Sequence, residues 1–318
     1  MFYSRFKKDI SAAKKRISFS GIKIADTKLG KIEYTTFGEG LPVLWVHGIL
    51  GGADQGTLSS QPLINKGFEL IAVSRFGYMG SPLPKDSTPA AQADLYAALL
   101  DELKIAKVSI VGFSAGGPSA LQFALRHPDR CSSLILLSAA VPPYKVPSGI
   151  TRFIAKKFFE SNFIFWCLAK YFPSLMMSMM GVPKPIQKKL SAADKKWLDN
   201  SMFSFLPMSD RINGILNDIW ISNPDLNRIY PYQEVTVPTL IVHAVDDPMP
   251  PFTIAKRIAG QIPDSKFLPI KSGGHLHIGH QSIVKLSISN FIVNNQKSPG
   301  SISTNAQHAA WQDQVGRI

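Results

Sequence analysis

The sequence predicts an α/β fold with one mostly parallel sheet and a helical insertion after the sixth strand. Two observations carry this prediction. Short β-branched runs alternate with segments of helical spacing on both sides of residues 142–232, as parallel strands joined by crossover helices do. Within 142–232 the alternation stops, and short helical segments rich in Phe and Met replace it. A chain of 318 residues, 45% apolar, can hold one large domain with such an insertion, or two ordinary domains.

Six strands are expected before the insertion. Residues 17–24 and 31–36 have the pattern of a β-hairpin with its turn near Leu29-Gly30, and an apolar strand then runs from residue 41 to His47-Gly48. The remaining strands are expected at 69–74, 108–111 and 133–138, with helices at 89–103 and after residue 115.

Alternation resumes after the insertion. We expect strands at 239–245 and 266–270 and helices at 251–259 and 281–294. The predicted organisation is therefore a basic N-terminal segment (1–16), a core formed by 17–141 and 233–295, a helical cap or lid (142–232) and a polar, disordered tail (296–318).

The pattern Gly112-Phe113-Ser114-Ala115-Gly116 joins a predicted strand to a predicted helix. A tight corner there leaves only glycine room two residues before and two residues after Ser114. The Ser114 hydroxyl would then be exposed at the top of the sheet, with the first N–H groups of a helix behind it. The pattern alone also arises by chance, so its weight comes from the strand before it and the helix after it.

Acidic and imidazole side chains follow the last two predicted strands. Asp246-Asp247 ends the strand at 239–245, and Gly274-His275 follows the strand at 266–270. The carboxyl ends of parallel strands meet at one edge of an open sheet, so these groups are expected near Ser114. The order serine, acid, histidine is one of the known orders of a catalytic triad.

Several assignments at this edge stay open. Successive side chains at a strand end point in opposite directions, so only one of Asp246 and Asp247 can reach the histidine. His277 and His280 compete with His275, which is favoured because the Gly-Gly turn bends the chain there. His47 is expected to be a structural hydrogen-bonding residue. The loop after it either supplies the Ile49 N–H to an oxyanion or is a plain strand-to-helix connection.

Together, His47-Gly48, the motif at 112–116, Asp247 and Gly274-His275 resemble the α/β-hydrolase fold family, and within it the cap-bearing serine esterase-like members. The resemblance covers roughly residues 17–293 and implies an eight-stranded, mostly parallel sheet with the cap after strand six. It favours Asp247 over Asp246. One departure is Ser74, where many relatives have an aspartate before the loop that begins at Arg75.

The expected function is hydrolysis of carboxylic esters of lipophilic substrates through an acyl-enzyme. Ser114 would be the nucleophile, His275 the base, Asp247 the orienting acid, and the N–H groups of Ile49 and Ala115 the oxyanion hole. No cofactor or metal is expected. The alternatives are a C–C bond hydrolase, a thioesterase or a haloperoxidase with the same triad, or a non-catalytic small-molecule receptor.

Charge and cysteine content bear on partners and location. Residues 1–16 hold six basic and one acidic side chain, and residues 142–232 hold twelve basic and six acidic, out of a net charge of +13. This favours an anionic membrane surface bound through 1–16 and the cap, rather than nucleic acid, whose binding motifs are absent from the sequence. A solvated N-terminal helix without a partner is the alternative.

Two cysteines and no secretory signal predict a cytoplasmic protein, with peripheral membrane contact. The sequence pattern does not determine the oligomeric state.

Overall fold

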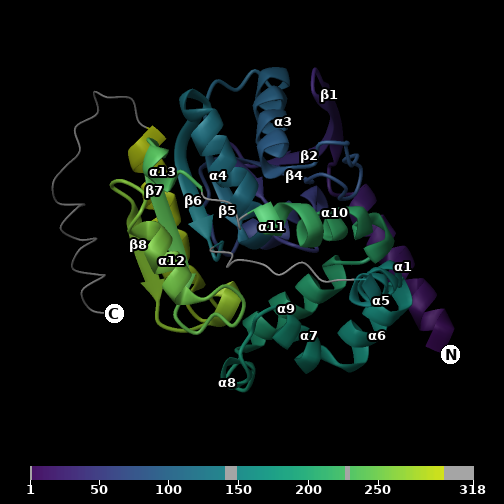
Figure 1. Ribbon diagram of the computed structural model, residues 1–318. Helices are drawn as coiled ribbons and strands as arrows, with labels where there is room; N and C mark the ends of the chain where they lie inside the picture. The colour runs from purple at the N-terminus through teal and green to yellow at the C-terminus, as the bar shows by residue number, and fades with distance from the viewer. Residues whose placement is uncertain (1, 140–148, 226–229, 297–318) are drawn as a thin grey trace.

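A computed structural model of the protein describes residues 2–139, 149–225 and 230–296 (Figure 1). Within these ranges, eight strands form one sheet in the order β1-β2-β4-β3-β5-β6-β7-β8. Only the β1–β2 and β2–β4 pairs are antiparallel. The predicted eight-stranded, mostly parallel α/β sheet is therefore confirmed. The strands are β1 (Lys23–Thr27), β2 (Gly30–Phe37), β3 (Leu41–Val46), β4 (Phe68–Val73), β5 (Val108–Phe113), β6 (Cys131–Leu137), β7 (Thr239–Ala244) and β8 (Lys266–Ile270).

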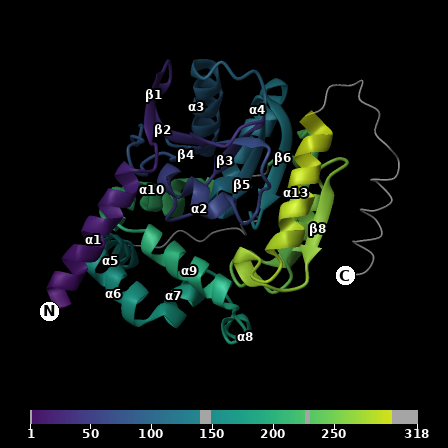
Figure 2. The same cartoon turned by 180° about the vertical axis from the view of Figure 1, so that it is seen from behind.

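Helices cover both faces of the sheet (Figures 1 and 2). Successive side chains of a strand point to opposite faces, so Leu44 and Val46 pack on one side and Val43 and Trp45 on the other. The first face is covered by α3 (Pro89–Glu102), α4 (Gly117–Arg126) and α12 (Phe252–Ala259). The second face is covered by α2 (Gly56–Ser60) and α13 (Gln281–Gln296). Burial on both sides explains why the central parallel strands β3 to β7 are mainly apolar.

The N-terminus differs from the prediction. Residues 17–24 do not form one strand, because α1 (Phe2–Ser18) continues through residue 17 and β1 begins only at Lys23. The helix ends where serine hydroxyls bond back to it: Ser18 donates to the Lys15 carbonyl and Ser20 to the Ile17 carbonyl, at 2.8 and 2.6 Å. Gly21, with φ at +67°, then turns the chain into β1.

A helical insertion follows β6 and lies at the lower end of the sheet in both views (Figures 1 and 2). Its own core includes Phe165, Trp166, Leu198 and Met202, all fully buried. The described helices are α5 (Gly149–Glu160), α6 (Asn162–Tyr171), α7 (Pro173–Met179), α8 (Lys184–Gln187), α9 (Ala192–Ser204), α10 (Ile212–Asn217) and α11 (Asn223–Asp225).

Two predicted boundaries fall where the described residues end. The expected start of the insertion at residue 142 lies outside the described residues, as does the expected tail from 297 onward. Gln296 itself ends α13, and its side-chain amide donates to the Pro42 carbonyl at 2.9 Å. In the described ranges, every helix is too short or too polar to cross a membrane.

Candidate active site

Ser114 occupies a tight corner between β5 and α4. Its φ of +50° is in the left-handed region, which costs energy for a residue with a side chain. A Cβ at Gly112 would lie 2.7 Å from the Ala120 Cβ, and one at Gly116 would lie 2.5 Å from the Val46 carbonyl oxygen. The two glycines are therefore required as predicted. A Cβ at Gly112 would also lie 3.1 Å from the Gly116 carbonyl oxygen, and Gly116 is in addition pressed against the end of β3.

The serine, the histidine and one aspartate form a continuous series of hydrogen bonds. His275 Nε2 lies 2.8 Å from Ser114 Oγ, and His275 Nδ1 lies 2.8 Å from Asp247 Oδ2. All three residues are buried, with exposed fractions of 9% for Ser114, 4% for His275 and 8% for Asp247. Residues 161 positions apart in the chain are thus within proton-transfer distance of one another.

Asp246 has a different position from its neighbour. Its carboxylate accepts the backbone N–H of Gly273 at 3.2 Å and that of Gly274 at 2.9 Å, the two residues immediately before His275. Asp247 points the other way, toward the imidazole, and its second oxygen accepts the Met249 N–H at 2.8 Å. One aspartate therefore binds the side chain of His275, and the other holds the turn that presents it.

The other histidines near this edge do not contact Ser114. His277 is fully buried, and burial lowers its pKa to about 3, reinforced by His275. His280 Nε2 lies 3.1 Å from the Ser272 hydroxyl. His47 Nε2 accepts the Arg75 N–H at 3.1 Å, and its Nδ1–H donates to the Gly48 carbonyl at 2.6 Å. Burial, followed by the charge of Arg75, holds the pKa of His47 well below its usual value, so it is a neutral structural residue.

The two residues predicted to donate to an oxyanion come from two different segments of the chain, the turn after β3 and the residue after Ser114. Ile49 lines the cavity beside the serine and sits in a turn whose next residue, Leu50, has a φ of +68°. Among the described residues, the Ile49 N–H has no hydrogen-bond acceptor. Ala115 follows Ser114 in a 3₁₀ turn whose first internal bond comes from Gly117 to the Ser114 carbonyl. Ala115 is buried beside the cavity but is not one of its lining residues.

A cavity of about 260 Å³ opens beside Ser114 and His275. Its remaining walls come from the end of β3, from α2 and from the insertion, and they are mainly apolar. In the described part of the chain, no lysine or arginine lines it. The insertion contributes Phe159, Met176, Met179, Met180, Trp197, Ser201, Ser204 and Phe205 to this wall.

A buried ion pair and a buried tyrosine that sequence reasoning missed support the Gly48–Leu50 turn. Arg75 forms a two-pronged ion pair with Asp218, and its Nη2 also donates to the Gly48 carbonyl at 3.2 Å. The Tyr78 hydroxyl donates to Asp218 at 2.5 Å. A single aspartate within an apolar helical stretch was the only sequence signal for Asp218.

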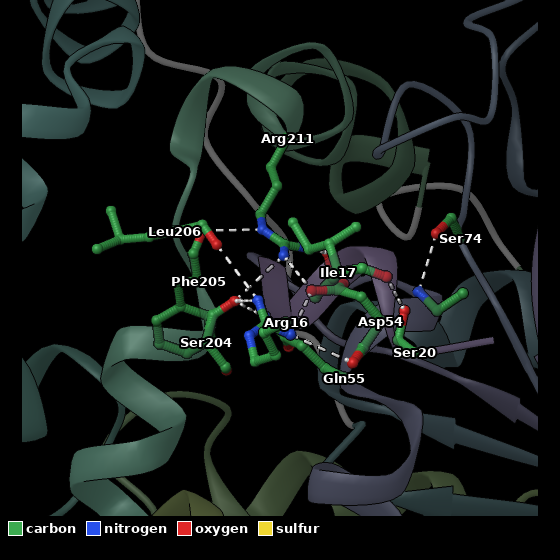
Figure 3. Close-up of polar contacts among 12 residues, drawn as sticks. Arg16, Ile17, Ser20, Asp54, Gln55, Ser74, Ser204, Phe205, Leu206 and Arg211 are labelled. Carbon is green, nitrogen blue, oxygen red and sulfur yellow. Dashed lines mark hydrogen bonds and ion pairs between the residues drawn. The ribbon is translucent and has the colours of Figure 1, made fainter. Parts of the chain in front are cut away.

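A second buried cluster joins α1 to the same loop and to the insertion (Figure 3). Asp54 Oδ2 lies 2.8 Å from both Arg16 Nη1 and Arg211 Nη2. Arg211 also donates to the Gly51 carbonyl at 2.5 Å, next to the turn that contains Ile49. The Ser204 carbonyl accepts from Arg16, Arg211 and Gln55, at 2.9, 3.1 and 3.0 Å.

The loop after β4 is anchored by Glu33 on β2. Glu33 Oε1 accepts the Ser74 hydroxyl at 2.7 Å, and Oε2 accepts the Gly80 N–H at 2.9 Å. Ser74 Oγ in turn accepts the Ala53 N–H at 2.8 Å. The Glu33 carboxylate and the Ser74 hydroxyl therefore anchor the loop together. Sequence reasoning missed Glu33, because strand alternation in an edge hairpin predicts that it faces solvent.

This fold, with a serine on a strained strand-to-helix corner bonded to a histidine at the carboxyl edge, defines the class of α/β hydrolases. The chain belongs to that family: residues 42–278 match the family model for the alpha/beta hydrolase fold. In the described ranges, no group of three or more His, Cys, Asp and Glu side chains could hold a metal ion.

The chain is similar to several individual members. It is 28% identical over 259 residues to the uncharacterized hydrolase YcgS of Bacillus subtilis, which covers 78% of this chain and 89% of the relative. It is 24% identical over 264 residues to a 2-hydroxy-6-oxononadienedioate/2-hydroxy-6-oxononatrienedioate hydrolase of Paraburkholderia xenovorans, covering 81% of this chain and 88% of the relative. The structure of an α/β hydrolase fold protein from Nakamurella multipartita superposes with a TM-score of 0.69 and 26% identity, covering 85% of this chain and 98% of that one.

Proposed function

We propose that the protein is a serine hydrolase that cleaves carboxylic esters of lipophilic substrates through an acyl-enzyme intermediate. The observation that carries this proposal is the hydrogen-bonded series Ser114–His275–Asp247 beside an apolar cavity. Each neighbouring pair is within hydrogen-bonding distance, so a proton can pass from the serine to the imidazole without a change of side-chain position.

Each residue has a definite step in the proposed reaction. His275 Nε2 accepts the Ser114 proton as Oγ bonds to the ester carbonyl carbon, and Asp247 stabilises the resulting imidazolium through Nδ1–H. The N–H groups of Ile49 and Ala115 donate to the carbonyl oxygen as it becomes negative. The imidazolium then protonates the leaving alkoxide, and water attacks the acyl-enzyme with His275 again as base, which restores the serine.

The cavity favours an uncharged, lipophilic substrate of limited size. Its volume of about 260 Å³ lies just below the roughly 300–1,000 Å³ typical of small-molecule sites, so short or medium acyl chains fit best. The named substrates of the Paraburkholderia relative are dicarboxylates. A dianion would lose its hydration in this pocket without a lysine or arginine from the described residues to pair with it, which disfavours that substrate class here.

An acyl-chain series of p-nitrophenyl esters tests the proposal. We expect kcat/KM to rise from acetate to medium chains, to fall for long ones, and to decrease by several powers of ten in Ser114→Ala. Ser265→Ala is the control, because Ser265 lies between α12 and β8, where its hydroxyl donates to the Ala259 carbonyl. Wild-type turnover by Ser114→Ala would eliminate the proposed nucleophile.

A fluorophosphonate probe separates an enzyme from a receptor on the same scaffold. Labelling of Ser114 together with fast ester turnover supports the enzyme. Labelling with negligible turnover of esters, thioesters and 1,3-diketones would instead identify a receptor. Faster turnover of thioesters or diketones than of esters would retain the mechanism and replace the proposed substrate class.

A further inference from the structure

Helix α6 is apolar on nearly every side. Its inward face, which includes Phe165 and Trp166, is fully buried in the core of the insertion. Phe163 packs against Trp166 at the edge of that core, with ring centroids 6.0 Å apart, but is still 40% exposed, and Ile164 is 42% exposed. A surface helix normally turns a polar face outward, so a helix with two apolar faces requires a second apolar environment.

The neighbouring helices extend this apolar surface. Phe2 of α1 stacks on Tyr171 with ring centroids 5.1 Å apart and meets Phe163 edge-on at 6.0 Å. The start of α1 is therefore joined to α6. Phe172 and Leu175, at the start of α7, are 58% and 50% exposed. The N-terminal end of α1 lies with α6 and α7 at the end of the molecule remote from the sheet in both views (Figures 1 and 2).

Basic residues accompany the apolar surface. Residues 2–18 and 162–189, which span α1 and α6 to α8, contain ten lysines and arginines but a single acidic residue, Asp9. Asp9 is already engaged, because it accepts the Trp166 indole N–H at 2.8 Å and lies 3.6 Å from Lys170 Nζ. Exposed cations include Lys8, Lys184 and Lys188. The cores of protein–protein interfaces are depleted in lysine, whereas lysines beside exposed aromatic and aliphatic side chains suit a layer of anionic headgroups.

We propose that this surface, formed by Phe2, Phe163, Ile164, Phe172 and Leu175 with the surrounding lysines, docks the protein on an anionic lipid membrane. The apolar side chains enter the boundary between headgroups and acyl chains, while the lysines pair with lipid phosphates. The proposal does not depend on the ester chemistry proposed above.

Helix α7 lies between the docking surface and the cavity. Met176, on its inner side, is buried and lines the cavity, whereas Leu175 faces outward. Met179 both lines the cavity and is 42% exposed. One helix thus separates the proposed membrane surface from the cavity beside Ser114, so a membrane-dissolved substrate would have a short path to the serine.

Vesicle sedimentation tests the proposal directly. The full chain is mixed with vesicles of phosphatidylcholine alone and with vesicles that also contain phosphatidylglycerol, at low and high salt. We expect partition only onto the anionic vesicles, and weaker partition at high salt because exposed charges are screened. The apolar variant Ile164→Ser/Leu175→Ser should bind several-fold more weakly. Each of Lys8→Gln and Lys188→Gln should weaken partition by about fivefold.

Matched substitutions on other surfaces are the controls. Leu286, 40% exposed on α13, is replaced by serine, and Lys256, exposed on α12, by glutamine. Both controls should partition like wild type. Failure of the wild type to bind anionic vesicles would overturn the proposal, as would equal binding by the patch variants and the controls. A dimer in solution that Ile164→Ser/Leu175→Ser dissociates, without vesicle binding, would assign the surface to a second copy instead.

Discussion

Arg16 of α1 and Asp54 of the loop after β3 form an ion pair of 2.8 Å that joins the first helix to the loop beside Ser114. The same carboxylate oxygen lies 2.8 Å from Arg211 of the insertion, whose side chain is fully buried (Figure 3). Burial opposes ionisation of Asp54, but Arg211 and Arg16 overcome it and lower its pKa. Asp54 thus holds together three segments from distant parts of the sequence.

Loss of the Asp54 carboxylate and loss of its more exposed partner, Arg16, should differ in their effect on stability. Asp54→Asn leaves the buried Arg211 charge uncompensated and is expected to lower the free energy of unfolding by about 3–5 kcal/mol. Arg16 is one-third exposed, so Arg16→Gln is expected to cost only about 1 kcal/mol. Urea unfolding monitored by circular dichroism measures both values. Equal losses of unfolding free energy in the two variants would show that the buried charge of Arg211 does not require the Asp54 carboxylate for its compensation.

Asp246 and Asp247 should have separable effects on turnover. Asp247→Asn is expected to reduce kcat by about 10⁴-fold, because an amide cannot stabilise an imidazolium and favours the wrong tautomer. Asp246→Asn keeps one acceptor for the Gly273 and Gly274 N–H groups, so a loss of roughly tenfold is expected from a loosened turn. Ester kinetics measure both. A larger loss in Asp246→Asn would reverse the assignment of the two aspartates.

Glu33 and Ser74 should show strong energetic coupling. Burial raises the pKa of Glu33, while the Ser74 hydroxyl and the Gly80 N–H oppose that rise. Ser74→Asp would place two carboxylates within 3 Å or so of each other, at an expected cost of about 2 kcal/mol. Glu33→Gln/Ser74→Asp removes one of those charges and should recover about 1 kcal/mol or more relative to the sum of the single variants. Additive losses in urea unfolding would contradict this coupling.

His277 should make the protein less stable in acid. Its pKa in the folded state is about 3, against 6.5 for an ordinary histidine, because of burial and the neighbouring His275. Below pH 6.5 the unfolded chain therefore binds a proton that the folded protein does not, and stability falls as the pH drops toward 3. One such group contributes a slope of up to about 1.4 kcal/mol per pH unit.

The replacement His277→Asn tests this slope. Asparagine tolerates the left-handed φ of +54° at this position and does not titrate. Unfolding free energies measured from pH 7.5 to 4.5 should fall less steeply in the variant than in wild type. A slope remains, because burial also lowers the pKa values of His47 and His243. Parallel curves for the two proteins would exclude His277 as a source of acid sensitivity.

Local patterns predicted most of the sheet and the residues at its edge. The strand that carries Ser114, the acidic pair after β7 and the glycine turn before His275 are each encoded within a few neighbouring residues. Strand boundaries were predicted to within two residues for β4, β5 and β6. The start of β1 was missed because Ile17 fits both a strand and the last turn of an amphipathic helix, and long-range contacts such as the one between Arg16 and Asp54 favour the helix.

By itself, the sequence determined the α/β class, the strained corner at Ser114 and the identity of the groups that meet at one edge. The tertiary structure alone decided that Asp246 holds the turn before His275, that Glu33 anchors the loop containing Ser74, and that Asp54 and Asp218 hold buried arginines. The physical reason is the range of the interactions. Backbone conformation and apolar periodicity depend on residues close in the chain, whereas a buried charge finds its partner only after distant segments have packed together.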